Sequence, residues 1–303
     1  MFKIVEFQSE DAILRGRLYS CADVSEKLPV VIMAHGFSAT INGMVADKYA
    51  EAFCKAGFAV LLYDHRNFGI SGGKPRQEIN KWVQARGYRD AINFVMTLPE
   101  IDALKIAVWG TSLSAAEAFA VGAMDSRVKA IIAQVPGFAD QLPPEDLDGA
   151  SFSSIRETFL NGDLDAIPEE TTEPLPVVSF DQKGTPSALL VLTAFRWFIE
   201  YGGRYGTGWE NSVSIVSKDT PVPLEVAFCA PQIKAPLLMV VAHNDEMEGA
   251  SSDIARKVFD MAPQPKELIE VDGGHFGLMH YPSALFDQSS KAQIDFLTRY
   301  LKQ

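Results

Sequence analysis

Four short apolar runs in the first half of the chain, each ending at small or polar residues, constrain the fold more than any other feature. They are LPVVIMAHG at 28–36, FAVLLYD at 58–64, LKIAVWG at 104–110 and VKAIIAQVP at 128–136. Runs of this length without polar alternation are typical of strands buried on both faces. Helical patterns separate them, so the sequence predicts a mostly parallel α/β sheet with helices on both faces.

The same rhythm extends to both ends of the chain. Further strands are expected at 2–7 and 12–19, as an antiparallel pair, and at 235–247 and 267–277, which gives eight strands in total. The expected helices cover about 45–56, about 80–97, a stretch beginning near Ser112, about 250–261 and 283–301.

Residues 137–230 interrupt this rhythm with proline-rich and acidic sequence. One helix is predicted inside the region, over 188–201, because its apolar positions suit a helix buried on most sides and glycines follow it. We therefore expect one core domain, formed by residues 1–136 and 231–303, and an inserted helical cap, or lid, at 137–230.

The charge and cysteine content exclude several classes of protein. With 27 basic and 39 acidic residues the net charge is −12, which disfavours a nucleic-acid surface or an anionic membrane face. No uncharged apolar run approaches the roughly 18 residues that span a bilayer. Cys21, Cys54 and Cys229 lack any paired spacing, so we expect reduced thiols and no metal site or cofactor. A cytoplasmic protein is expected, and the apolar cap helix could support a homodimer.

Polar residues with catalytic potential follow the apolar runs. In open parallel sheets, ligands bind beyond the carboxyl ends of the strands. Ser112, Asp245 and His275 stand at such positions, in the chain order serine, aspartate, histidine. A serine alcohol becomes nucleophilic when an imidazole takes its proton and a carboxylate orients that imidazole. Glu246, Glu248 and Asp272 are nearby alternatives to Asp245 as the acid.

The surroundings of Ser112 fit a nucleophile elbow with one departure. Gly110 and Ser112 match the pattern G-x-S-x-G, but Ser114 occupies the last position. A tetrahedral intermediate also needs two N–H donors, one from the residue after the nucleophile and one from an earlier strand end. Leu113 and Phe37 occupy those places.

Five motifs together resemble the α/β-hydrolase superfamily and extend over nearly the whole chain. They are HGF at 35–37, YDHRNFGISGG at 63–73, WGTSLS at 109–114, NDEM at 244–247 and GGHFG at 273–277. Within that superfamily the sequence is most similar to a bacterial and fungal group that includes polyketide transferases and toxin-biosynthesis hydrolases. The resemblance implies that Ser112 is the nucleophile, His275 the general base and Asp245 its orienting acid.

Other residues are given binding or structural roles. Apolar aromatic walls bury most of a bound organic ligand, and the candidates for the substrate-binding wall are Phe37, Trp197, Tyr201, Tyr205, Trp209 and Phe276. Asp64 is expected to anchor its own loop with Arg66, and His35 to shape its turn.

The leading functional hypothesis is an esterase or thioesterase that forms an acyl-enzyme on Ser112 and acts on a small molecule with an apolar or aromatic acyl group. An acyltransferase or cyclising enzyme of polyketide-type biosynthesis would use the same acyl-enzyme. A lyase that uses the triad as a base, a binding protein without catalysis and a peptidase remain alternatives. A halide-displacing enzyme is disfavoured, because it needs an acid at position 112.

Overall fold

The computed structural model describes residues 1–21, 26–161, 171–216 and 224–302. Within these ranges eight strands form one sheet, in the order β1-β2-β4-β3-β6-β7-β9-β10. The strands are β1 (Phe2–Ser9), β2 (Ala12–Tyr19), β3 (Leu28–Ala34), β4 (Ala59–Tyr63), β6 (Ile101–Thr111), β7 (Val128–Gln134), β9 (Leu237–Ala242) and β10 (Lys266–Val271). The strands from β4 to β10 pair in parallel, whereas β2 is antiparallel to both of its neighbours. The predicted α/β class and eight-stranded sheet are confirmed.

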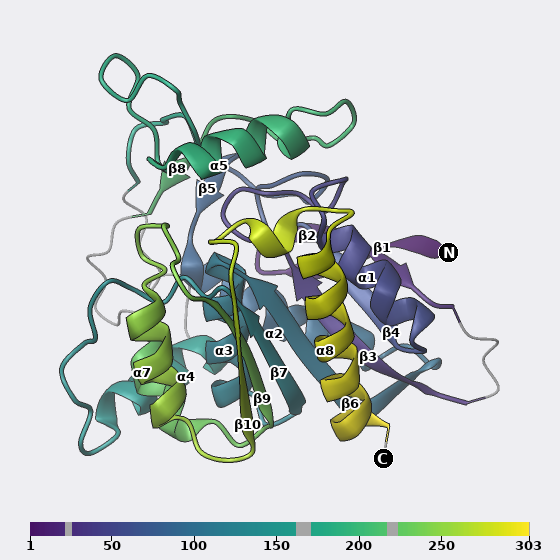
Figure 1. Ribbon diagram of the computed structural model, residues 1–303. Helices are drawn as coiled ribbons and strands as arrows, with labels where there is room; N and C mark the ends of the chain where they lie inside the picture. The colour runs from purple at the N-terminus through teal and green to yellow at the C-terminus, as the bar shows by residue number, and fades with distance from the viewer. Residues whose placement is uncertain (22–25, 162–170, 217–223, 303) are drawn as a thin grey trace.

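Helices cover both faces of the sheet, as predicted. They are α1 (Ala46–Lys55), α2 (Lys81–Val95), α3 (Leu113–Met124), α7 (Ser252–Met261) and α8 (Ala284–Leu301). Side chains of β3 alternate between the two cores: Val30 and Ile32 pack with α2 and α3, while Val31 and Met33 pack with α1 and α8. The fully apolar runs are explained by this burial on both faces. Figure 1 shows α8 in front of the sheet.

The chain between β7 and β9 contributes to two parts of the molecule. It contains α4 (Ala150–Asn161), α5 (Leu192–Trp197), the π-helix η2 (Phe198–Gly202), β8 (Ser214–Ile215), α6 (Val226–Cys229) and the 3₁₀ helix η3 (Ala230–Gln232). The short strand β5 (Glu78–Ile79) pairs with β8. Helix α5 lies above one end of the sheet (Figure 1), whereas α4 packs against α2 and α6 against α3. The helix predicted over 188–201 begins only at Leu192, and α4 was not expected.

Two of the three cysteines form a disulfide, so the expectation of reduced thiols is wrong for Cys21 and Cys54. Cys21 follows β2 and Cys54 lies near the end of α1. Packing of α1 against β2 brings their Cα atoms to 5.4 Å, a separation typical of disulfides. Cys229 is buried and free. Among the described helices, none is long and apolar enough to cross a membrane.

Candidate active site

Ser112 lies in the tight turn between β6 and α3. Its backbone has φ 58° and ψ −121°, a conformation that costs a non-glycine residue free energy and is often found at functional sites. Two glycines allow the chain to approach this closely. A Cβ on Gly110 would lie 2.0 Å from the carbonyl oxygen of Ser114, and one on Gly36 would lie 3.1 Å from Cβ of Ser112. The turn therefore has the tight strand-to-helix geometry expected of a nucleophile elbow.

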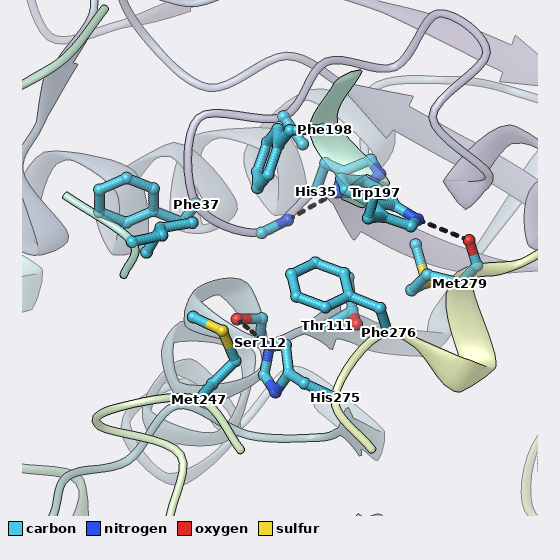
Figure 2. Close-up of a pocket in the computed structure, with 13 residues that line it drawn as sticks. His35, Phe37, Thr111, Ser112, Trp197, Phe198, Met247, His275, Phe276 and Met279 are labelled. Carbon is cyan, nitrogen blue, oxygen red and sulfur yellow. Dashed lines mark hydrogen bonds between the residues drawn. The ribbon is translucent and has the colours of Figure 1, made fainter. Parts of the chain in front are cut away.

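The structure brings Ser112, His275 and Asp245 together. The Ser112 hydroxyl donates to Nε2 of His275 at 2.8 Å, and Nδ1 of His275 donates to Oδ2 of Asp245, also at 2.8 Å. Figure 2 shows Ser112 and His275 pointing toward one another. The side chains of His275 and Asp245 are only 4% and 3% exposed. The serine and the carboxylate thus bind opposite nitrogens of one buried ring, the arrangement needed to pass a proton from serine to imidazole.

The other three acidic side chains considered for this role do not bind the imidazole ring of His275. Glu248 and Asp272 are exposed. Glu246 accepts a hydrogen bond from the main-chain N–H of His275 at 2.9 Å and not from its ring. Oδ1 of Asp245 accepts from the N–H of Met247 at 2.9 Å, which fixes the carboxylate toward the imidazole.

The two predicted oxyanion donors lie in the chain segments that flank Ser112. Leu113 is the first residue of α3, where N–H groups have no acceptor within the helix and the helix dipole is positive. Phe37 follows Gly36, whose backbone packs against Ser112. An anion that formed beside Ser112 would therefore meet the N-terminus of α3.

Ser114, which stands where the pattern has its final glycine, is accommodated in the turn by buried hydrogen bonds. Its side chain is fully buried and donates a hydrogen bond to the carbonyl oxygen of His35. It also lies 2.8 Å from Nε2 of His65, and Oε2 of Glu117 lies 3.3 Å from the same nitrogen. Burial lowers the pKa of His65 to about 3, so its imidazole is neutral near pH 7, and burial raises the pKa of Glu117 well above its ordinary value. Sequence reasoning missed this cluster.

His35 and Asp64 have structural roles, as expected. His35 accepts from the N–H of Gly36 and donates from Nε2 to the carbonyl oxygen of Met44 at 2.5 Å, and burial lowers its pKa to about 4. Asp64 accepts from two loop N–H groups, and burial raises its pKa to about 6. The expected partner is wrong, because Arg66 forms its ion pair with Asp11 at 2.8 Å.

A cavity opens above Ser112. Aromatic and sulfur-containing side chains dominate its wall (Figure 2), and among the described residues no acidic, lysine or arginine side chain lines it. The lining residues are His35, Gly36, Phe37, Ala39, Thr111, Ser112, Leu189, Trp197, Phe198, Met247, His275, Phe276 and Met279. Such a wall suits an uncharged organic group.

Three of the six predicted binding residues line this cavity: Phe37, Trp197 and Phe276. Tyr201 is buried behind Trp197, at 5.5 Å between ring centroids. Tyr205 is fully exposed, because the chain has left the helix by that point.

The remaining predicted binding residue, Trp209, stacks on Phe198 at 5.3 Å and does not line the cavity. Phe198 and Met247 were missed, although each stands within two residues of a predicted site residue. Within the described ranges, no three His, Cys, Asp or Glu side chains group closely enough to hold a metal ion.

A model of the alpha/beta hydrolase fold matches residues 29–281, and the chain belongs to that family. A thiohydrolase from Arthrinium phaeospermum is 41% identical over 99% of this chain and 97% of its own length. A polyketide transferase from Stachybotrys chlorohalonatus is 28% identical over 98% of this chain and 97% of its own. The crystal structure of an alpha/beta hydrolase from Penicillium sp. sh18 superimposes with a TM-score of 0.74 at 26% identity, with full coverage of both chains. The resemblance to hydrolases and polyketide transferases is confirmed.

Proposed function

We propose that the protein is a serine hydrolase that cleaves an ester or thioester of an apolar or aromatic acyl group. The observation that carries the proposal is the line of hydrogen bonds from Ser112 through His275 to Asp245, at the base of an apolar cavity. The thiohydrolase among the relatives favours a thioester.

In the proposed reaction, Oγ of Ser112 attacks the acyl carbonyl carbon while Nε2 of His275 takes its proton. Asp245 holds the imidazole and stabilises its charged form. The N–H groups of Phe37 and Leu113 bind the oxyanion, and the leaving thiolate or alkoxide takes the proton from His275. Water, activated by the same imidazole, then releases the acid from the acyl-enzyme.

Acyl transfer is the second candidate function. The same acyl-enzyme would be intercepted by an alcohol, amine or intramolecular hydroxyl group in place of water. Two observations favour it: a polyketide transferase is among the relatives, and aromatic side chains of α5 and η2 roof the cavity, which limits the entry of water.

We also propose that residues 137–230 act as the cap, with α5 and η2 as its roof over the cavity. The exposed side chains of Leu190, Leu192 and Ile199, at 55%, 57% and 47%, are the surface through which a homodimer would form. The dimer is tested by light scattering, which compares the mass of the native chain with that of a variant in which Leu190, Leu192 and Ile199 are all replaced by serine.

The cytoplasmic location expected from the sequence remains a proposal, and the Cys21–Cys54 disulfide argues against it, because such bonds persist mainly in oxidising compartments. Alkylation of free thiols in intact cells, followed by mass analysis of both cysteines, tests the location.

Reaction with a fluorophosphonate probe tests the nucleophile. Intact mass should reveal one adduct on the native protein, none on Ser112→Ala and slower labelling of His275→Ala. N-acetylcysteamine thioesters of benzoate and hexanoate, with and without an added alcohol, then separate hydrolysis from transfer. Absence of an adduct on the native protein would contradict an acyl-enzyme and favour a lyase or a binding protein.

A further inference from the structure

Glu246 lies between the roof of the cavity and the histidine loop. One carboxylate oxygen, Oε1, accepts a hydrogen bond from the hydroxyl of Thr193 at 2.6 Å. The other, Oε2, accepts from the main-chain N–H of His275 at 2.9 Å. Thr193 belongs to α5, so one half-buried carboxylate joins the roof helix to the residue that contacts Ser112.

The backbone of the histidine loop is shaped around this carboxylate. Gly274 has φ 66°, and a Cβ at this position would lie 2.4 Å from Oε2 of Glu246. Burial raises the pKa of Glu246, but the hydrogen bonds from Thr193 and the His275 N–H, together with the charge of His275, outweigh it and lower the pKa overall. Glu246 is therefore ionised near neutral pH, next to the loop where the reaction would develop positive charge.

A second contact holds the far end of the same roof helix to the same loop. Nε1 of Trp197 donates to the carbonyl oxygen of Met279 at 2.7 Å, and the rings of Trp197 and Phe276 stack at 5.2 Å. Helix α5 is thus attached on both sides of His275, which makes the roof part of the support of the histidine.

We propose that Glu246 is a positioning residue for His275, which couples the roof helix to the histidine and supplies a second negative charge beside it. This inference rests on the proposed function, because it assigns His275 the role of general base. Asp245 acts on the ring at Nδ1, and Glu246 acts on the backbone; these are the two carboxylates that contact His275 in the described part of the chain.

The chain offers a matched control in the same loop. Glu248 carries the same charge but is exposed. Glu246→Gln and Glu248→Gln therefore make the same change in net charge, and a long-range effect of charge would move both variants equally. Thr193→Val removes only the hydrogen bond from the roof.

The test is the rate of fluorophosphonate labelling of Ser112 from pH 5 to 9, with thermal melting as a check on folding. For Glu246→Gln we expect a roughly 10-fold fall in the limiting labelling rate, little change in probe affinity and an acid limb shifted to lower pH, because a charge favouring imidazolium is lost. Thr193→Val should slow labelling about threefold in the native background and not at all in Glu246→Gln, since coupled residues are non-additive. Glu248→Gln should match the native protein.

Labelling of Glu246→Gln at the native rate and with the native pH profile would overturn the positioning role while leaving the proposed function intact. Equal shifts in Glu246→Gln and Glu248→Gln would also overturn it. Failure of the native protein to label would overturn both proposals together.

Discussion

Two clusters of serine, histidine and a carboxylic acid are built on serines two residues apart, Ser112 and Ser114, and they differ in how the histidine is used. In the first, Ser112 and Asp245 bind opposite nitrogens of His275. In the second, Ser114 and Glu117 both lie at Nε2 of His65. The Nδ1 atom of His65 has no hydrogen-bond partner among the described residues.

The protonation of the second cluster follows from its hydrogen bonds. The single proton of Ser114 is donated to the carbonyl oxygen of His35, so Nε2 of His65 must carry a hydrogen and donate it to Ser114. His65 therefore cannot take a proton from this serine. Ser114 is also 0% exposed, whereas Ser112 lines the cavity. The same combination of serine, histidine and a carboxylic acid can thus form the proposed reactive site or a buried support, and the ring nitrogen that is used and the access of solvent decide which.

The largest expected effect is on the first cluster. Ser112→Ala should lower thioester turnover by at least about 10⁴-fold, because no nucleophile remains. It should not lower the denaturation midpoint, since no buried hydrogen bond outside the site is lost. Turnover within tenfold of native would mean that another group attacks the substrate.

Asp245→Asn should lower kcat by about 10³-fold or more, because an amide does not hold Nδ1 protonated and cannot stabilise imidazolium. The paired change in the second cluster, Glu117→Gln, should leave kcat within about twofold. Steady-state kinetics on one thioester would test both. A similar loss in the two variants would contradict the division between reactive and supporting clusters.

Ser114→Ala should lower stability and leave kcat nearly unchanged, which is the opposite of the effect expected for Ser112→Ala. Removing the hydroxyl takes away the buried hydrogen bond to the carbonyl oxygen of His35 and the contact with Nε2 of His65, which costs roughly 1–3 kcal/mol of stability. The kcat should change less than about fivefold, because Ser112 and His275 are untouched. Urea unfolding and kinetics on the same preparation test this, and loss of activity at unchanged stability would contradict it.

The smallest effect concerns the pH dependence of stability. The folded protein keeps Glu117 protonated above 4.5, its ordinary pKa, while the unfolded chain releases the proton, so this contribution to stability is full below pH 4.5 and is lost as pH rises. Relative to Glu117→Gln, the native protein should lose stability as the pH rises above 4.5. Parallel stability curves for the two proteins would show that Glu117 is ionised in the fold.

The contribution of His65 to stability changes with pH in the opposite direction. Its folded pKa of about 3 lies below the ordinary 6.5, so its contribution is full above pH 6.5 and is lost as pH falls toward 3. Since Glu117→Gln retains His65, the difference between the two proteins isolates the carboxyl group.

The sequence predicted those features that depend on local pattern. Strands buried on both faces are visible as uninterrupted apolar runs. Ser112, Asp245 and His275 each follow one of these strands, and they meet at the carboxyl ends of the sheet. Contacts between segments distant in sequence left no such pattern. The Cys21–Cys54 bond depends on how α1 packs, and the meeting of Ser114 with His65 depends on the turn after β4.

The residues of the cavity wall were also only partly predictable from the sequence. An aromatic-rich segment was visible in the sequence, but which rings face inward depends on where the helix begins and ends. Helix α5 ends at Trp197 and continues as a π-helix closed by a bond from the Gly203 N–H to the Phe198 carbonyl oxygen at 3.1 Å. Trp197 and Phe198 consequently line the cavity, while Tyr205 lies in solvent.

The disulfide between Cys21 and Cys54 contributes to the stability of the fold but not to the chemistry of the site. Among the described residues no cysteine lines the cavity, and the bond joins two positions 33 residues apart, next to β2. A cross-link over that length restricts the unfolded chain and stabilises the fold by roughly 4 kcal/mol in the chain-entropy model. Reducing conditions would therefore shorten the working life of each molecule while leaving the rate of each turnover unchanged.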